Sequence, residues 1–168
     1  MKQIILPITG AIFFIVLVGL LTQKIQNGKL SFPNNKNTVL SQQSEVKIND
    51  LVIPVKIANT DTKRRTGLAS HDSLPKEEGM LFKFAQKNVQ PPFWMKNMKF
   101  AIDIIWIDDG VIVQIDKDVQ PPTPNTPDEE LTLYAPDQLI DYVLEVNAIF
   151  TEENGIKIGD TVNSSSFK

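Results

Sequence analysis

Apolar residues are distributed along this chain in two different ways. From Ile4 to Leu21 they form one nearly continuous run of 18 residues without a charged side chain. As a helix, this run would be about 27 Å long, close to the roughly 30 Å hydrocarbon core of a bilayer. We therefore expect residues 1–22 to form one membrane-spanning helix.

This helix is expected to be retained as an anchor. Leu20, Leu21 and Thr22 stand where a signal peptide would carry the small residues of a cleavage site. The amino terminus with Lys2 favours a cytoplasmic N-terminus, whereas Lys24 and Lys29 favour the reverse. We expect a single-pass membrane protein whose C-terminal domain is extracytoplasmic.

Residues 23–44 differ in composition from both of their neighbours. Asn, Gln, Ser and Lys predominate, and Pro33 interrupts the segment. A segment of this kind buries too little apolar surface to fold by itself. We expect it to be a flexible tether between the anchor and a domain at residues 45–168.

From residue 45 onward the pattern is that of short strands. Apolar and polar residues alternate on both sides of Asn49-Asp50, and Asp109-Gly110 is a strong signal for a second tight hairpin. Strands are expected at 45–48, 51–57, 79–84, 92–100, 101–108, 111–119, 140–147 and near Val162. Short helices are expected at 60–68 and 148–154. The predicted fold is a mainly antiparallel β sandwich or barrel with two short helices.

Composition excludes several kinds of chemistry. The chain has no cysteine and one histidine, which excludes disulfides, a thiol nucleophile and metal sites built from thiolates or several histidines. The net charge of −3 argues against a nucleic-acid partner. We therefore expect no metal, no cofactor and no nucleic acid.

The expected strand 101–108 is apolar on both faces, which predicts a buried central strand, and Asp103 is unusual because it lies within it. A carboxylate in such a strand must be paired to stay charged, by Lys96, Lys99, Arg64 or backbone N–H groups, and Lys96 is the partner that we expect. A structural ion pair and a ligand-binding carboxylate both fit the pattern. Of the two, we predict the structural pair.

Five residues besides Asp103 are candidates for a binding site. On the expected strand 92–100, Trp94 could stack on a sugar ring or a cation, with Lys96 and Asn97 beside it, or could belong to the core. Arg64 shares a helix face with Leu68 and is expected to point toward the domain. Glu145 lies on the more polar face of its strand, where it lines the same site or faces solvent.

Several sequence blocks resemble one family. They are Gly67-Leu68, Gly79-Met80-Leu81-Phe82, Phe93-Trp94-Met95-Lys96-Asn97-Met98, Asp103-Ile104-Ile105, Asp109-Gly110, Tyr142-Val143-Leu144-Glu145-Val146-Asn147 and Gly155-Ile156-Lys157-Ile158-Gly159-Asp160. In this order they resemble domain-of-unknown-function family 192 of bacteria and archaea. The resemblance implies a β-sandwich fold and a cell-envelope setting, and it implies no particular reaction.

Together these observations favour a membrane-tethered β-domain that binds a small polar ligand or an envelope protein. The candidate ligand-binding residues are Arg64, Trp94, Lys96, Asn97, Asp103 and Glu145. One alternative is an enzyme in which Asp103 and Glu145 act as an acid/base pair tuned by Lys96. Another is a structural module of a membrane assembly.

Overall fold

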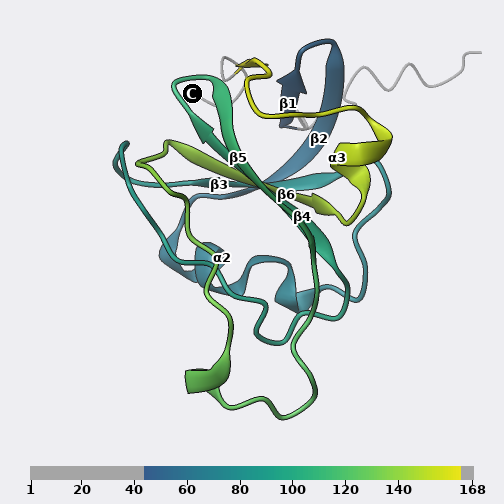
Figure 1. Ribbon diagram of the computed structural model, residues 1–168, viewed down its shortest axis with the longest axis vertical. Helices are drawn as coiled ribbons and strands as arrows, with labels where there is room; N and C mark the ends of the chain where they lie inside the picture. Colours follow the sequence, from purple (N-terminus) through teal and green to yellow (C-terminus); the bar gives the residue numbers. More distant parts are fainter. Residues whose placement is uncertain (1–43, 164–168) are drawn as a thin grey trace, which may run out of the picture. The chain divides into compact units, whose positions relative to one another are not determined.

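The computed structural model describes residues 44–163 of the chain. Within this range the chain forms one seven-stranded sheet with short helices around it (Figure 1). The strands are β1 (Glu45–Ile48), β2 (Leu51–Ala58), β3 (Gly79–Lys83), β4 (Ile102–Asp108), β5 (Val111–Val119), β6 (Tyr142–Asn147) and β7 (Val162–Asn163). The helices are α2 (Asp61–Thr66), the 3₁₀-helices η1 (Gly67–Ser70) and η2 (Asp128–Glu130), and α3 (Phe150–Glu153).

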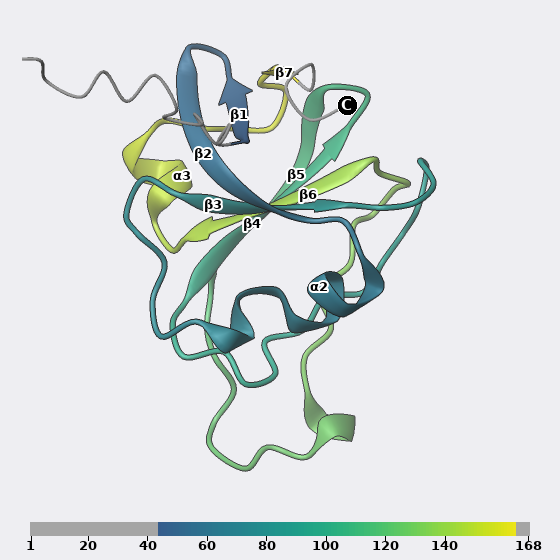
Figure 2. The same cartoon turned by 180° about the vertical axis from the view of Figure 1, so that it is seen from behind.

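The sheet is nearly closed into a barrel. Its strand order is β5-β4-β6-β3-β2-β1-β7, and a bridge between Val111 and Thr161 brings the two ends of that order together. The Val162 N–H also donates to the Gly110 carbonyl at 2.8 Å, next to the β4–β5 turn (Figure 2). Closure removes the exposed sheet edges that an open sheet would leave. The expected mainly β fold is confirmed, in its barrel form.

Both predicted hairpins are present. Asn49 has φ of 50° in the β1–β2 turn, and Asp109 and Gly110 have φ of 43° and 74° in the β4–β5 turn. Two successive positive φ angles define the type I′ turn, which matches the right-handed twist of paired strands. Local sequence therefore determined these two pairings.

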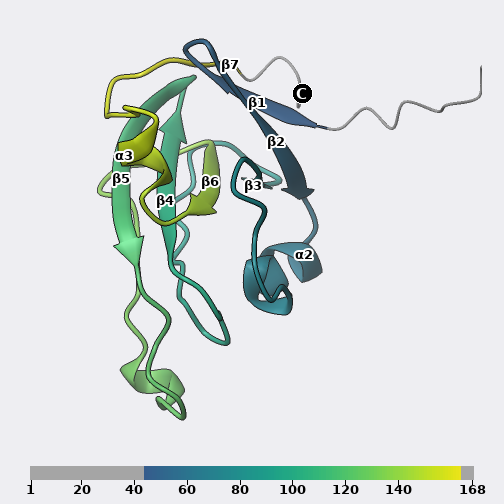
Figure 3. The ribbon, with the colours of Figure 1, turned by 90° about the vertical axis from the view of Figure 1, so that its right-hand side faces the viewer.

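The connection from β2 to β3 was not expected in this form. The two strands pair in parallel, with Val55 opposite Gly79, so the chain must cross over between them. The crossover contains α2, whose N-cap Thr60 accepts a hydrogen bond from the Lys63 N–H at 3.2 Å. Figure 3 shows α2 just beyond the end of β2. This crossover places α2 beside the outer face of the sheet.

The sheet separates two apolar cores. Along β4, Ile105 and Ile107 belong to the core inside the barrel, whereas Ile104 and Trp106 belong to a second core on the outer face. All four side chains are fully buried. Since successive side chains of a strand point to opposite faces, β4 must be covered on both sides, as its continuous apolar sequence predicted.

The prediction of a strand at residues 92–100 is wrong. This segment is a loop that touches other backbone through one bridge, between Phe93 and Tyr134, and then turns where the Met98 N–H donates to the Met95 carbonyl at 3.1 Å. The ring of Phe93 packs edge-on against Phe82 and Trp106, with centroids 4.9 and 5.4 Å away. The apolar residues of this segment therefore cover the outer core as a loop.

The expected anchor, and the expected tether up to residue 43, lie outside the described residues. Among residues 44–163, no helix combines the length and the apolar character that crossing a bilayer requires.

Candidate functional site

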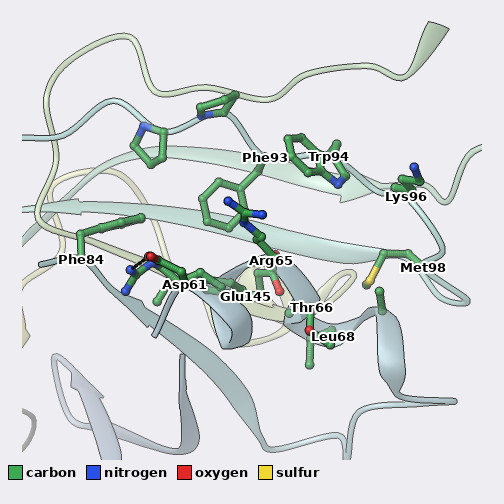
Figure 4. Close-up of a pocket in the computed structure, with 16 residues that line it drawn as sticks. Asp61, Arg65, Thr66, Leu68, Phe84, Phe93, Trp94, Lys96, Met98 and Glu145 are labelled. Atoms are coloured by element: carbon green, nitrogen blue, oxygen red, sulfur yellow. Dashed lines mark hydrogen bonds and ion pairs between the residues drawn. The ribbon is translucent and has the colours of Figure 1, made fainter. Parts of the chain in front are cut away.

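A pocket of about 350 Å³ lies in the layer that covers the outer face of the sheet. Helix α2 and η1 form one side and the loop before β4 forms the other, while β6 contributes one residue (Figure 4). Its charged lining residues are Asp61, Arg64, Arg65, Lys96 and Glu145. Its aromatic lining residues are Phe82, Phe84, Phe93 and Trp94. This mixture of apolar walls and a few polar groups is typical of small-molecule sites.

Arg64 fixes the helical side of the pocket. Its guanidinium donates to the Lys83 carbonyl at 2.7 Å, pairs with Asp61, and lies 5.8 Å from the centre of the Phe84 ring. The side chain is only 17% exposed, so it points toward the domain as its spacing from Leu68 predicted. These contacts tie α2 to the end of β3.

On the loop side of the pocket, Phe93 is held in place by its contacts, and the side chain of Trp94 is exposed. The Phe93 N–H donates to the Tyr134 carbonyl at 2.7 Å, and its ring is held in the outer core. The next side chain, Trp94, is 46% exposed and lines the pocket. Lys96 lines the same side and pairs with Asp128 of η2. An exposed indole in a fixed loop offers a flat apolar surface to a ligand.

Glu145 is the most unusual group of the site. It lies on β6 between Met80 of β3 and Ile104 of β4, and it is 7% exposed. Its Oε2 atom is buried without a hydrogen-bond partner in the described part of the chain. Loss of hydration raises the pKa of this carboxyl group to about 8. At neutral pH the carboxyl group is therefore mostly protonated.

Four of the six candidate residues line this one pocket, namely Arg64, Trp94, Lys96 and Glu145. Asn97 is exposed and is not among the lining residues. Its backbone has φ of 61°, a conformation that asparagine tolerates better than most residues, so it shapes the turn after Lys96. Asp103 also lies outside the pocket lining.

Asp103 holds the short helix α3 in place. Its Oδ1 accepts the N–H groups of Asp118 and Ile149 at 2.9 and 3.3 Å. Its Oδ2 accepts the N–H and the hydroxyl of Thr151 at 3.0 and 2.7 Å. The prediction that Lys96 pairs with Asp103 is wrong, because Lys96 pairs with Asp128. The carboxylate is satisfied by hydrogen-bond donors from two segments far away in the sequence.

Asp103 and Glu145 also point to opposite faces of the sheet. Glu145 is opposite Ile104, whose side chain belongs to the outer core, and Asp103 is opposite Val146, whose side chain lies inside the barrel. Residues directly opposite each other share a face. The two carboxyl groups are thus separated by the sheet.

Sequence reasoning missed part of the lining. Arg65 is exposed, but it also lines the pocket with Asp61 one helical turn earlier. The spacing of these two residues was a usable signal, because residues four apart share a helix face. Asn147, at the end of β6, donates to the Leu74 and Pro75 carbonyls at 3.1 and 3.0 Å.

Over the described range 44–163, no three side chains among histidine, aspartate and glutamate lie close enough together to hold a metal ion.

The fold and pocket define a small β-barrel domain with a partly covered cavity on its outer face. The chain belongs to domain-of-unknown-function family 192, described as "Uncharacterized ACR", whose model matches residues 44–164. The resemblance stated from the sequence blocks is therefore confirmed. No curated protein is significantly similar to the chain.

Two solved structures are similar to this chain. A protein of unknown function from Novosphingobium aromaticivorans is 27% identical with a TM-score of 0.63, over 71% of this chain and 83% of that one. A putative transcription regulator from Sinorhizobium meliloti is 25% identical with a TM-score of 0.63, over 71% of this chain and 92% of that one.

Proposed function

We propose that the barrel domain binds a small polar ligand in the pocket beside α2. The observation that carries this proposal is the buried Oε2 of Glu145 at a cavity, where no group of residues 44–163 forms a hydrogen bond with it. Buried polar atoms in folded proteins are nearly always hydrogen-bonded, so an orphaned one calls for an explanation. A ligand group that enters the pocket supplies the missing partner.

The other features of the pocket support binding rather than acid/base catalysis. The acid/base alternative needs Asp103 and Glu145 to act on one substrate, and the sheet lies between them. General acid and base groups must both reach the reacting atoms. Glu145 instead stands with Arg64, Trp94 and Lys96, a set suited to holding a molecule in one orientation.

The test is a thermal-shift screen of the full-length protein against sugars, nucleotides, amino acids and divalent ions. A ligand that binds only the folded state raises the melting temperature as its concentration exceeds the dissociation constant. Ala69→Phe, which places a ring in the pocket lining, should abolish the shift. Ser70→Phe, at the next position and outside this lining, is the matched control. A shift that survives Ala69→Phe would refute binding in this pocket.

We also propose that residues 1–22 hold the domain at a membrane. The support is the apolar run from Ile4 to Leu21, whose length suits a bilayer core. The test is fractionation of cells that produce the full chain and a chain beginning at residue 42. Recovery of the full chain in the soluble fraction would refute the proposal.

A further inference from the structure

The charges that surround the pocket favour an anionic ligand. Arg64 and Lys96 are paired with Asp61 and Asp128, so two of the lining cations are already balanced. Arg65 is exposed on the same helix, and within residues 44–163 no carboxylate pairs with it. A ligand carboxylate would provide the planar partner that a guanidinium binds through two parallel hydrogen bonds.

The walls of the pocket favour a ring. Phe93 and Trp94 follow each other on the loop side, and Phe84 lies across the pocket from Trp94 under Arg64 (Figure 4). Phe93 is fixed by two edge-on aromatic contacts, whereas the indole of Trp94 is half exposed. Stacking on such a surface suits a flat apolar face and needs no rearrangement of the loop.

The Glu145 end of the pocket favours a hydroxyl group. Met80 and Ile104 flank this carboxyl group on the sheet, and the cations Arg64 and Arg65 line the same cavity. A ligand amine would meet those cations as a like charge. A hydroxyl can both donate and accept, so it satisfies a carboxyl group in either protonation state.

Building on the proposed function, we propose that the ligand is a hydroxylated ring acid, of the kind represented by sugar acids. Its carboxylate binds Arg65, one ring face stacks on Trp94, and a hydroxyl group hydrogen-bonds Glu145. The volume of about 350 Å³ is at the small end of ligand pockets, which suits a single ring rather than an oligomer. Arg64 and Lys96 also line the pocket, and each is held by an ion pair with its own carboxylate.

The experiment is isothermal titration of the full-length protein at pH 7 with matched probes. D-glucuronate, D-galacturonate and quinate carry the acid, the ring and the hydroxyls. D-glucose lacks the acid, cyclohexanecarboxylate lacks the hydroxyls, and D-glucosamine lacks the acid and carries an amine in place of one hydroxyl. We expect at least one of the three acids to bind roughly tenfold or more tightly than each of the other three probes.

Amino-acid substitutions test which residue makes each contact with the ligand. Arg65→Gln should weaken binding of the acid roughly tenfold and leave D-glucose unchanged, because only the charged contact is lost. Lys63→Gln removes the same charge from α2 at a position outside this pocket, so it is the matched control. Glu145→Leu should reduce the preference for the hydroxylated acid over cyclohexanecarboxylate.

The outcomes separate this inference from the proposed function. Tighter binding of D-glucose or D-glucosamine that Ala69→Phe abolishes would overturn the ligand class and leave the pocket as a binding site. Equal effects of Arg65→Gln and Lys63→Gln would overturn the assigned contact and with it the inference. No binding by any of the three acids would also overturn it, whereas the proposed function fails only if the wider screen gives no pocket-dependent shift.

Discussion

Replacement of Asp103 by asparagine tests whether this carboxylate holds the barrel and α3 together. The side chain is fully buried, and its two oxygens accept four hydrogen bonds, two at each oxygen. Asparagine has nearly the same shape but presents an NH₂ group in place of one oxygen. Because three of the four donors are backbone N–H groups, that NH₂ group must face at least one donor that it cannot accept from.

The loss of stability in Asp103→Asn follows from these four hydrogen bonds. A hydrogen bond to a charged group contributes about 1.5–3 kcal/mol, and a buried donor left unsatisfied costs about 1–3 kcal/mol. If the NH₂ group takes the place of Oδ2, the Thr151 hydroxyl can turn to accept from it, but the Thr151 N–H loses its acceptor. If the NH₂ group takes the place of Oδ1, the N–H groups of Asp118 and Ile149 both lose their acceptor. We expect Asp103→Asn to lower the free energy of unfolding by about 3 kcal/mol or more. This is a large share of the roughly 5–15 kcal/mol typical of a domain.

Urea unfolding of a chain that begins at residue 42 measures this effect. The wild type and Asp103→Asn should differ in midpoint with similar slopes, since the surface exposed on unfolding is nearly the same. Asp137→Asn, the same substitution at an exposed carboxylate, is the control and should change the free energy by no more than about 0.5 kcal/mol. A loss below about 1 kcal/mol for Asp103→Asn would refute the reasoning, because four satisfied contacts would then contribute almost nothing.

Three further predictions concern the same domain. Glu145→Gln should become more stable relative to wild type as pH rises from about 5 to 8, by up to about 1.4 kcal/mol per pH unit, because the unfolded carboxyl group ionises near its ordinary pKa of 4.5 whereas the folded one holds its proton up to a pKa of about 8. Urea unfolding at several pH values checks this, and a pH-independent difference would contradict it. Gly79→Ala should cost about 1–3 kcal/mol, because its Cβ would lie 2.9 Å from the Glu145 carbonyl oxygen on the neighbouring strand. The chain from residue 42 should unfold in one cooperative transition, whereas a broad melt would show that earlier residues belong to the fold.

The sequence determined the features that depend on neighbours in the chain. The Asp109-Gly110 turn fixed one hairpin and the alternation around Asn49-Asp50 fixed another, because turn geometry and strand period are local properties. The apolar residues on both faces of residues 102–107 showed that this strand would be covered on both sides. The position of Arg64 on the inner side of α2 followed from helical spacing.

Tertiary structure decided the features that depend on distant segments. The donors to Asp103 come from Asp118, Ile149 and Thr151, which no short-range sequence pattern identifies. Lys96 is merely a cation that lies nearby in the sequence. The loop around Trp94 alternates like a strand, yet aromatic packing, not pairing, holds it on the sheet. The pocket exists only because the parallel β2–β3 crossover brings α2 beside that loop and beside Glu145. Local chemistry sets turns and periods, whereas a binding cavity depends on which distant surfaces the closed sheet brings together.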